Sequence, residues 1–202
     1  MAGALEAAFV STKPRTSFGK TLVVAVAALV VLLLLWRFSF TIELVAYAFL
    51  AVVGVQLSVI DLRRRILPNV IVVPSIGVGA ALLILAAAVE NRFGDLITAV
   101  LGAVVLFALY LGLALLSPKG LGMGDVKLAA LIGLYLGFQG WPQLLAGTLA
   151  AFVLAALAAA VTLAVKRGGL TTVIPFGPFM LAGAALALLP GDPVTHWMLP
   201  LA

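Results

Sequence analysis

Two aspartates lie at the ends of long apolar stretches in a chain that carries only 7 acidic residues among 202. Asp61 ends one stretch and is followed by three arginines, and Asp125 begins another inside the sequence Gly-Met-Gly-Asp-Val-Lys-Leu. Ionisable groups at membrane depth are costly, so each is a candidate functional residue. Two neighbouring carboxyl groups can share one proton, because close like charges oppose double ionisation. Such a pair could hydrolyse a peptide bond, with one group activating water and the other protonating the substrate.

The position of each aspartate on its helix indicates which one is ionised. Asp125 would lie at a helix N-terminus, whose positive end favours a carboxylate, and Asp61 at a helix C-terminus, which favours the protonated acid. The arginines Arg63, Arg64 and Arg65 would act the other way if they folded back towards Asp61. We therefore predict that Asp125 is the base of the pair.

The composition requires a membrane around these helices. Hydrophobic residues make up 65% of the chain and charged residues 9%, which is more apolar surface than a soluble domain of this size can bury. The apolar runs recur near the ~20 residues that a membrane-spanning helix needs. We predict an all-α, polytopic membrane helix bundle with about seven transmembrane helices: Thr21–Trp36, Ile42–Ile60, Val70–Val89, Leu96–Leu116, Val126–Phe138, Leu144–Val165 and Val173–Leu189.

The basic residues predict the orientation of this bundle. With a cytoplasmic N-terminus, all but Arg37 and Arg92 of the 12 lysines and arginines fall on the cytoplasmic side, as the positive-inside rule requires. Since they flank apolar segments, they indicate topology, and no nucleic acid is expected as a partner. The predicted domains are a cytoplasmic tail at 1–20, a transmembrane domain at 21–190 and an extracytoplasmic tail at 191–202. Asp61 and Asp125 lie at the cytoplasmic boundary, whereas water should solvate the acids at the outer ends of the spans: Glu43, Glu90, Asp95 and Asp192.

The fifth predicted span is short. Val126–Phe138 has 13 residues, or about 20 Å of helix, against a hydrocarbon core about 30 Å thick. Gly120, Gly122 and Gly124 precede it and would let the backbone bend in a loop that lines a cavity. We therefore expect this loop to carry Asp125 into the membrane plane.

Three stretches resemble, in order, the motifs of the type IV prepilin peptidases, a family of GxGD-type intramembrane aspartyl proteases. The first motif of that family is an aspartate shortly before a Pro-Asp or Pro-Asn pair, the second is GxGD, and a PFGPF element lies near the end. The matching residues are Asp61, Pro68 and Asn69 in the first, Gly122, Gly124 and Asp125 in the second, and Pro175, Gly177 and Pro178 in the third.

The resemblance implies an aspartic endopeptidase with Asp61 and Asp125 as its catalytic residues and no cofactor or metal ion. Its substrates would be prepilins or pilin-like proteins, from which it would remove a short basic leader peptide at the cytoplasmic face. The protein would be a multi-pass protein of the prokaryotic cell membrane, in contact with the lipid bilayer.

Two departures from the longer members of this family indicate a peptidase-only form. Bifunctional members carry a cytoplasmic domain with zinc-binding cysteine pairs that is linked to N-methylation of the cleaved pilin. This chain has no cysteine, and about five residues separate its first two predicted spans. The second aspartate of the long first motif is also missing, because Ile60 precedes Asp61. The sequence is therefore most similar to the short, Flp/Tad-like branch.

The other motif residues are predicted to shape the site. Lys127 is interpreted as a cytoplasmic topology charge in preference to a catalytic group. Pro68 would end one helical segment, and Asn69 would cap the next. The third motif would form the start of the last helix through Pro175, Gly177 and Pro178.

Two alternatives remain open for the sequence alone. A transporter or channel subunit could use the two acids to bind protons or cations, since broken helices and intramembrane acids are typical of that class. Against it, the acids lie at the inner boundary, and no inverted repeat is evident. An inactive assembly factor could also keep this fold.

Overall fold

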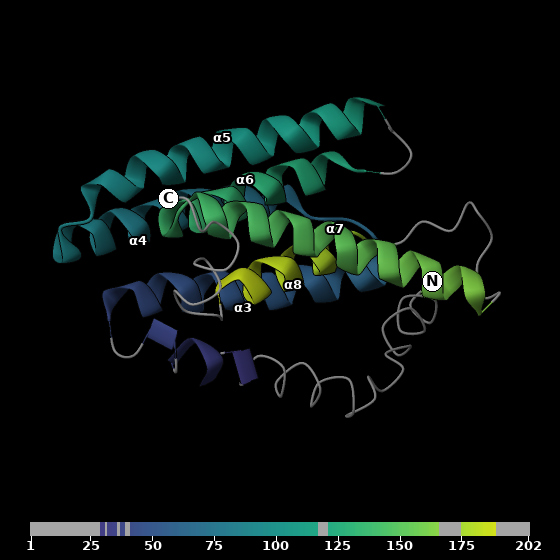
Figure 1. The fold of residues 1–202 in the computed structure, drawn as a ribbon, viewed down its shortest axis with the longest axis horizontal. Helices are drawn as coiled ribbons and strands as arrows, with labels where there is room; N and C mark the ends of the chain where they lie inside the picture. Colours follow the sequence, from purple (N-terminus) through teal and green to yellow (C-terminus); the bar gives the residue numbers. More distant parts are fainter. Residues whose placement is uncertain are drawn as a thin grey trace, which may run out of the picture.

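The computed structural model describes residues 29–30, 32–35, 37–38, 41–116, 121–165 and 175–188, and all the regular structure in these ranges is helical (Figure 1). The predicted terminal tails and most of the first predicted span lie outside the described residues. Six helices confirm the other predicted spans: α3 Ile42–Arg64, α4 Asn69–Glu90, α5 Phe93–Leu116, α6 Met123–Gln139, α7 Trp141–Ala164 and α8 Gly177–Leu188.

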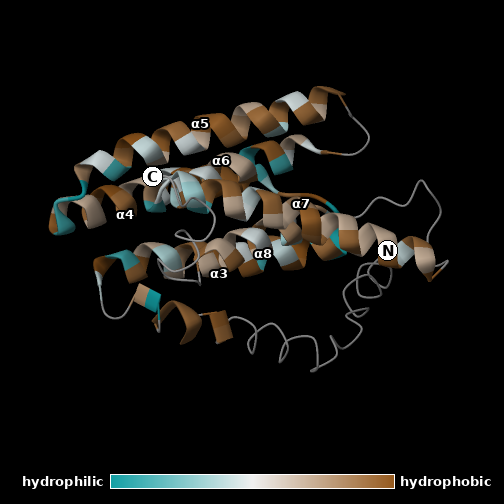
Figure 2. Ribbon diagram, viewed as in Figure 1, coloured by the Kyte–Doolittle hydropathy of each residue, from teal (hydrophilic) through white to brown (hydrophobic). Residues whose placement is uncertain are grey.

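The helices form a polytopic membrane bundle. Four of them, α3, α4, α5 and α7, are long and apolar enough to cross a bilayer, whereas α6 has 17 residues and α8 has 12. The ribbons of these helices are mainly hydrophobic along their length (Figure 2). Many large aliphatic side chains point outwards, for example Ile97 and Val104 on α5. An outer surface made of aliphatic side chains is suited to contact with the lipid chains of a bilayer.

α6 is the central helix of the bundle. Eleven of its residues are buried, and α4, α5, α7 and α8 all pack against it. Its contact with α5 depends on glycine, because a Cβ at Gly102 would lie 2.5 Å from the carbonyl oxygen of Gly133. A Cβ at Gly137 would likewise overlap the backbone of Thr98. Small residues let membrane helices approach this closely, and the resulting van der Waals packing stabilises their association.

The pairing of α5 with α6 sets the depth at which α6 begins. Gly102 faces Gly133, and continuing this antiparallel register brings Met123 level with Gly112. Since α5 extends four residues beyond Gly112, it projects about 6 Å past the start of α6 at 1.5 Å per residue. The first turn of α6 is therefore recessed by about one helical turn from the end of α5.

The predicted start of this helix was wrong by three residues. α6 begins at Met123, with Gly122 at the N-cap, so Gly124 lies inside the helix and not in a preceding loop. The physical reason is local capping, because the Asp125 side chain accepts a hydrogen bond from the backbone N–H of Gly122. Gly120, the remaining glycine of the predicted loop, lies outside the described residues.

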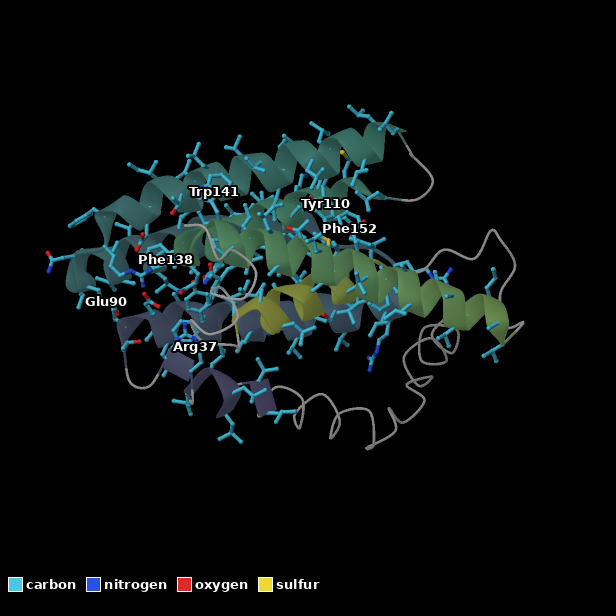
Figure 3. All side chains as sticks on the ribbon, viewed as in Figure 1. Arg37, Glu90, Tyr110, Phe138, Trp141 and Phe152 are labelled. Atoms are coloured by element: carbon cyan, nitrogen blue, oxygen red, sulfur yellow. The ribbon has the colours of Figure 1, made fainter. Side chains whose placement is uncertain are left out.

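A polar cluster closes the opposite end of the bundle. Arg92, in the turn between α4 and α5, forms ion pairs with Glu43 and Asp95 and lies 4.9 Å from the centre of the Phe138 ring. Gln139 donates to Glu43 at 3.1 Å and to the Tyr47 hydroxyl at 2.9 Å. Figure 3 shows two other labelled residues at this end, Arg37 and Glu90.

The prediction that water solvates Glu43 was wrong. Glu43 is only 5% exposed, and Arg92 and Gln139 take the place of water as its partners. Burial opposes the charge of Arg92, but the hydrogen bond with Asp95 and the charge of Glu43 raise the pKa of this guanidinium above its ordinary value. The cluster thus ties α3, α6 and the α4–α5 turn together.

Replacing Glu43 with glutamine should lower the thermal stability of the protein. Glu43 is buried while 34% of the Arg92 side chain is exposed, so the cost should lie between the ~1 kcal/mol of an exposed ion pair and the ~3–5 kcal/mol of a broken buried one. Thermal unfolding in detergent measures it. The control is Glu90→Gln, because Glu90 lies 4.0 Å from Arg92 at the limit of an ion pair. Equal melting temperatures for the two variants would contradict this account of the cluster.

Candidate functional site

Asp61 is buried at the junction of α3 and α8. It lies in the last turn of α3, its residue is 5% exposed, and its Oδ2 accepts a hydrogen bond of 3.1 Å from the backbone N–H of Gly177. Gly177 is the first residue of α8, where backbone N–H groups have no partner within the helix. Gly177 of the third sequence motif therefore holds the side chain of Asp61, which belongs to the first motif.

Glycine at position 177 leaves room for this contact. A Cβ there would lie 2.8 Å from Oδ2 of Asp61, which is closer than real Cβ contacts come. Pro178 follows in the first turn of α8, where proline is tolerated because no N–H is needed. Pro175 lies just before the helix. α8 begins at Gly177, so these residues lie at the start of the last helix, and their role in shaping it stays a prediction.

Asp125 lies in the first turn of α6 and is half-buried. Its Oδ2 accepts a hydrogen bond of 3.0 Å from the N–H of Gly122. The positive end of the helix dipole and this N–H both favour a carboxylate at position 125. The predicted placement at a helix N-terminus is correct.

Leu67 joins the three motifs. A Cβ at Gly124 would lie 2.8 Å from the Cβ of Leu67, and a Cβ at Gly177 would lie 3.5 Å from its Cδ1. The loop that precedes Pro68 is thus packed between the start of α6 and the start of α8. Leu67 thus contacts both the residue before Asp125 and the residue whose N–H binds Asp61. The structure therefore brings the two predicted aspartates together at one end of the bundle.

A second link between the first two motifs is a hydrogen bond. Lys127 Nζ donates to Oδ1 of Asn69 at 2.9 Å, which connects α6 with the start of α4. The prediction that Asn69 caps α4 was wrong, because Pro68 occupies the N-cap and Asn69 is the first helical residue. The amide of Asn69 binds a neighbouring helix and not the end of its own. Lys127 consequently has a structural partner besides its predicted role as a topology charge.

We expect Lys127→Ala and Asn69→Ala to be coupled in stability. The bond is exposed to solvent, so its contribution should be about 1 kcal/mol. A double-mutant cycle of melting temperatures, with both single variants and the double variant, isolates this term. Strictly additive losses would show that the lysine and the asparagine do not stabilise the fold together.

The three arginines after Asp61 do not fold back onto it. Arg63, Arg64 and Arg65 are exposed, and within the described residues no ion pair joins any of them to Asp61. Arg65 adopts a left-handed conformation with φ 53° and ends α3 by donating its N–H to the carbonyl oxygen of Asp61. The arginines would have favoured the ionised form of Asp61 only by folding back towards it, and they do not lie in that position.

Sequence reasoning missed an aromatic cluster next to the site. Tyr110 is 1% exposed and packs against Phe176, with 6.0 Å between ring centres, and against Phe152, at 5.7 Å. Phe176 directly precedes Gly177. The negative charge of Asp125 acts on the Tyr110 hydroxyl. Figure 3 shows Tyr110 and Phe152 side by side, away from the polar end of the bundle. A lone tyrosine within an otherwise apolar helix was the available signal.

Comparison with known proteins identifies relatives over most of the chain. Residues 44–165 match the model of the type IV leader peptidase family. The prepilin leader peptidase/N-methyltransferase of Pseudomonas putida is 34% identical over 190 residues, which cover 90% of this chain and 62% of that protein. The protein of the same name from Aeromonas hydrophila is 36% identical over 149 residues, 72% of this chain and 49% of the relative. The protein of the same name from Pseudomonas aeruginosa is 30% identical over 175 residues, which cover 83% of this chain and 57% of that protein.

The chain spans about half to three-fifths of the length of these curated relatives. No solved structure matches it.

Proposed function

The chain belongs to the type IV leader peptidase family, and we propose that it is an aspartic endopeptidase that removes the leader peptide from prepilins or pilin-like proteins. The observation that carries this proposal is the convergence of Asp61 from α3 and Asp125 from α6, with the Gly177 N–H bonded to Asp61. The relatives named above are prepilin leader peptidases. A membrane helix bundle with two adjacent acids suits a substrate that is itself anchored in the bilayer.

In the proposed mechanism Asp125 is the base and Asp61 the acid. The Asp125 carboxylate, at the N-terminus of α6, takes a proton from water as the water oxygen attacks the scissile carbonyl carbon. Asp61 in its protonated form donates a proton to the carbonyl oxygen as the tetrahedral centre forms. The peptide C–N bond then breaks as Asp125 passes its proton to the leaving nitrogen, and Asp61 takes a hydroxyl proton from the tetrahedral centre as the new carboxyl group forms. The Gly177 N–H fixes one oxygen of Asp61, which leaves Oδ1 free to carry the proton.

We further propose that the protein does not methylate its product. The names of the relatives include an N-methyltransferase activity, but the methylating members of the family resembled here carry paired cysteines. This chain contains none. The rival function, a transporter or channel subunit that binds protons or cations at the two acids, would require these residues to face a conducting path.

Processing of a prepilin in cells tests the proposal. The protein is co-expressed with a candidate prepilin, and loss of the leader is followed as a gel shift. Mass spectrometry of the new N-terminus should show an unmethylated residue, and the rate in membranes should be unchanged by metal chelators. An intact prepilin at matched expression would refute the peptidase assignment, whereas a methylated product made by this protein alone would refute only the peptidase-only form.

The site is proposed to face the cytoplasm, and cysteine labelling checks this. Because the chain has no cysteine, single cysteines at Lys119 and at Phe93, the exposed neighbour of Arg92, report one side each without background. Positive-inside topology predicts that an impermeant thiol reagent applied to intact cells labels position 93 and spares position 119. The reverse pattern would place Asp61 and Asp125 on the outer face and remove the cytoplasmic assignment.

A further inference from the structure

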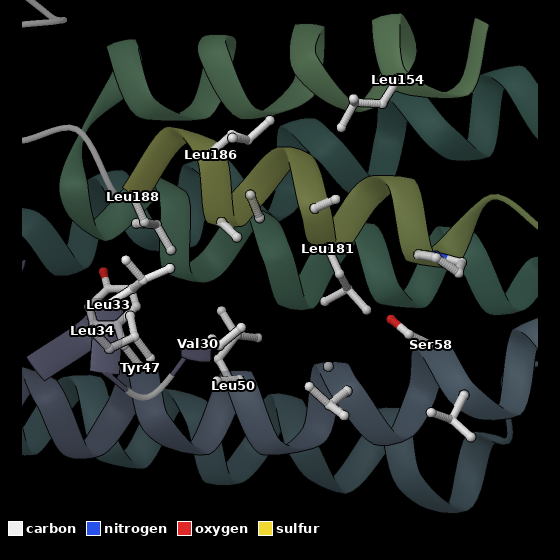
Figure 4. Close-up of a pocket in the computed structure, with 18 of the residues that line it drawn as sticks. Val30, Leu33, Leu34, Tyr47, Leu50, Ser58, Leu154, Leu181, Leu186 and Leu188 are labelled. Carbon is white, nitrogen blue, oxygen red and sulfur yellow. The ribbon is translucent and has the colours of Figure 1, made fainter. Parts of the chain in front are cut away.

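An apolar groove of about 640 Å³ lies between α3 and α8. Leu50, Gly54 and Ser58 line it from α3, and Leu181 and Leu186 line it from α8 (Figure 4). The described part of the first predicted span also contributes to the lining, through Val30, Leu33 and Leu34. Nearly all of the lining side chains are aliphatic. At membrane depth such a groove accepts an apolar segment and offers it close van der Waals contact.

One end of the groove adjoins the candidate site. Leu62 and Pro178 line this end, and they directly follow Asp61 and Gly177, whose hydrogen bond of 3.1 Å joins α3 to α8. From Leu62 the lining continues along α3 to Tyr47, a distance of about 22 Å along a helix. The groove thus runs from the aspartate along most of a hydrocarbon core that is about 30 Å thick.

Ser58 is a polar exception close to the aspartate. It precedes Asp61 by one helical turn, and its hydroxyl points into the groove in Figure 4. The hydroxyls of Ser75 and Thr148 donate to the carbonyl four residues earlier in their helices. Ser58 has no such bond within the described part of the chain, so its hydroxyl is available to an occupant of the groove.

Resting on the proposed peptidase function, we propose that this groove binds the membrane-anchored part of a prepilin substrate, as an apolar helix that follows the bond at which the leader is removed. An acyl chain of a lipid has no group that could bond to Ser58 and no reason to end at Asp61. A substrate helix meets both conditions, because the free N–H groups of its first turn can bond to the Ser58 hydroxyl and its first residues must lie at the aspartates. It would run antiparallel to α3, since the substrate leaves the site towards the opposite end of the bundle.

This register identifies a position for the test. Ala51 lines the groove ten residues before Asp61, or about 15 Å away along α3. Val52, the next residue, is 49% exposed and points away from the groove. A substrate residue about ten positions after the cleaved bond should therefore lie against Ala51 and not against Val52.

The first measurement compares Ala51→Trp with Val52→Trp on an intact prepilin. Filling the groove should lower kcat/KM by roughly tenfold or more through a higher KM, because uniform binding energy is lost, whereas the lipid-facing tryptophan should have little effect. Melting temperatures of both variants confirm that they are folded. Unchanged kinetics for both would show that the groove holds lipid and would overturn the proposal.

The second measurement is disulfide cross-linking, which requires neither catalysis nor a tryptophan variant that folds. Single cysteines at Ala51 or Val52 are oxidised with a prepilin that carries one cysteine about ten residues after its cleavage site. Disulfide formation with position 51 and not with position 52 is expected. Equal formation with both positions, or none with position 51, would contradict the groove. Failure of the peptidase function itself would appear separately, as a prepilin that the unmodified protein does not cleave.

Discussion

Asp61→Asn and Asp125→Asn should each abolish leader cleavage while the protein still inserts and folds. Asparagine keeps the volume of the side chain and can still accept the N–H of Gly177 at position 61 or of Gly122 at position 125. It cannot gain or lose a proton, so the exchange that the pair performs is lost. General acid–base catalysis contributes about 10²–10⁴-fold, and we expect losses at the upper end because both groups act as one unit.

The control for these variants is Glu90→Gln, at the opposite end of the bundle. It removes a carboxylate that, like Asp125, is half-buried, and it should leave the rate of cleavage unchanged. Rates are compared in membranes at matched protein levels, with the melting temperature of each variant measured in detergent. Cleavage by either aspartate variant at the rate of the unmodified protein would show that the two aspartates do not form the catalytic pair.

Gly177→Ala is expected to have the second largest effect. The new Cβ would lie 2.8 Å from Oδ2 of Asp61, so either the carboxyl group or the start of α8 must move. Misplacement of a catalytic group by about 1 Å can cost about 10²-fold in rate, and we expect a loss of this size in kcat with a small change in KM. The assay is prepilin cleavage under saturating substrate.

A matched control for this variant is Gly77→Ala on α4. A Cβ at Gly77 meets no atom within 4 Å, so the substitution tests the loss of glycine in a helix without a clash. It should leave the rate unchanged and the stability equal or slightly higher. If Gly177→Ala were as active as Gly77→Ala, the contact between α8 and Asp61 would have no part in positioning the carboxyl group.

The membrane helices could be predicted from the sequence because hydropathy is a local property. The runs that became α3, α4, α5 and α7 are long and apolar, and their boundaries were predicted within a few residues. α6 was predicted to start too late because its first turn contains glycine and aspartate, which are poor helix formers. The hydrogen bond between Asp125 and the Gly122 N–H decides that start.

The two aspartates of the site could be found from the sequence, but their surroundings could not. Asp61 and Asp125 stood out as isolated acids within recognisable motifs. The partner of Asp61, Gly177, is 116 residues away, and no local pattern shows that its N–H would point at a carboxylate. Asn69 was assigned to a helix cap from its type alone, whereas packing gave it Lys127 as a partner. Contacts of this kind depend on how the helices pack, which hydropathy does not specify.

The ion pair of Glu43 with Arg92 imposes an order on the assembly of the bundle during synthesis. Glu43 emerges from the ribosome 49 residues before Arg92 and 96 residues before Gln139. A carboxylate that is buried without its partner is strongly destabilising, so α3 cannot take its final place among the helices when it enters the bilayer. α3 can span the bilayer with Glu43 in water at the membrane surface, but its packing must wait until the α4–α5 turn has reached the same side. Docking of α3 is therefore a late event that reports the arrival of Arg92, and a chain that stalls before that residue should leave α3 unpacked and open to proteolysis.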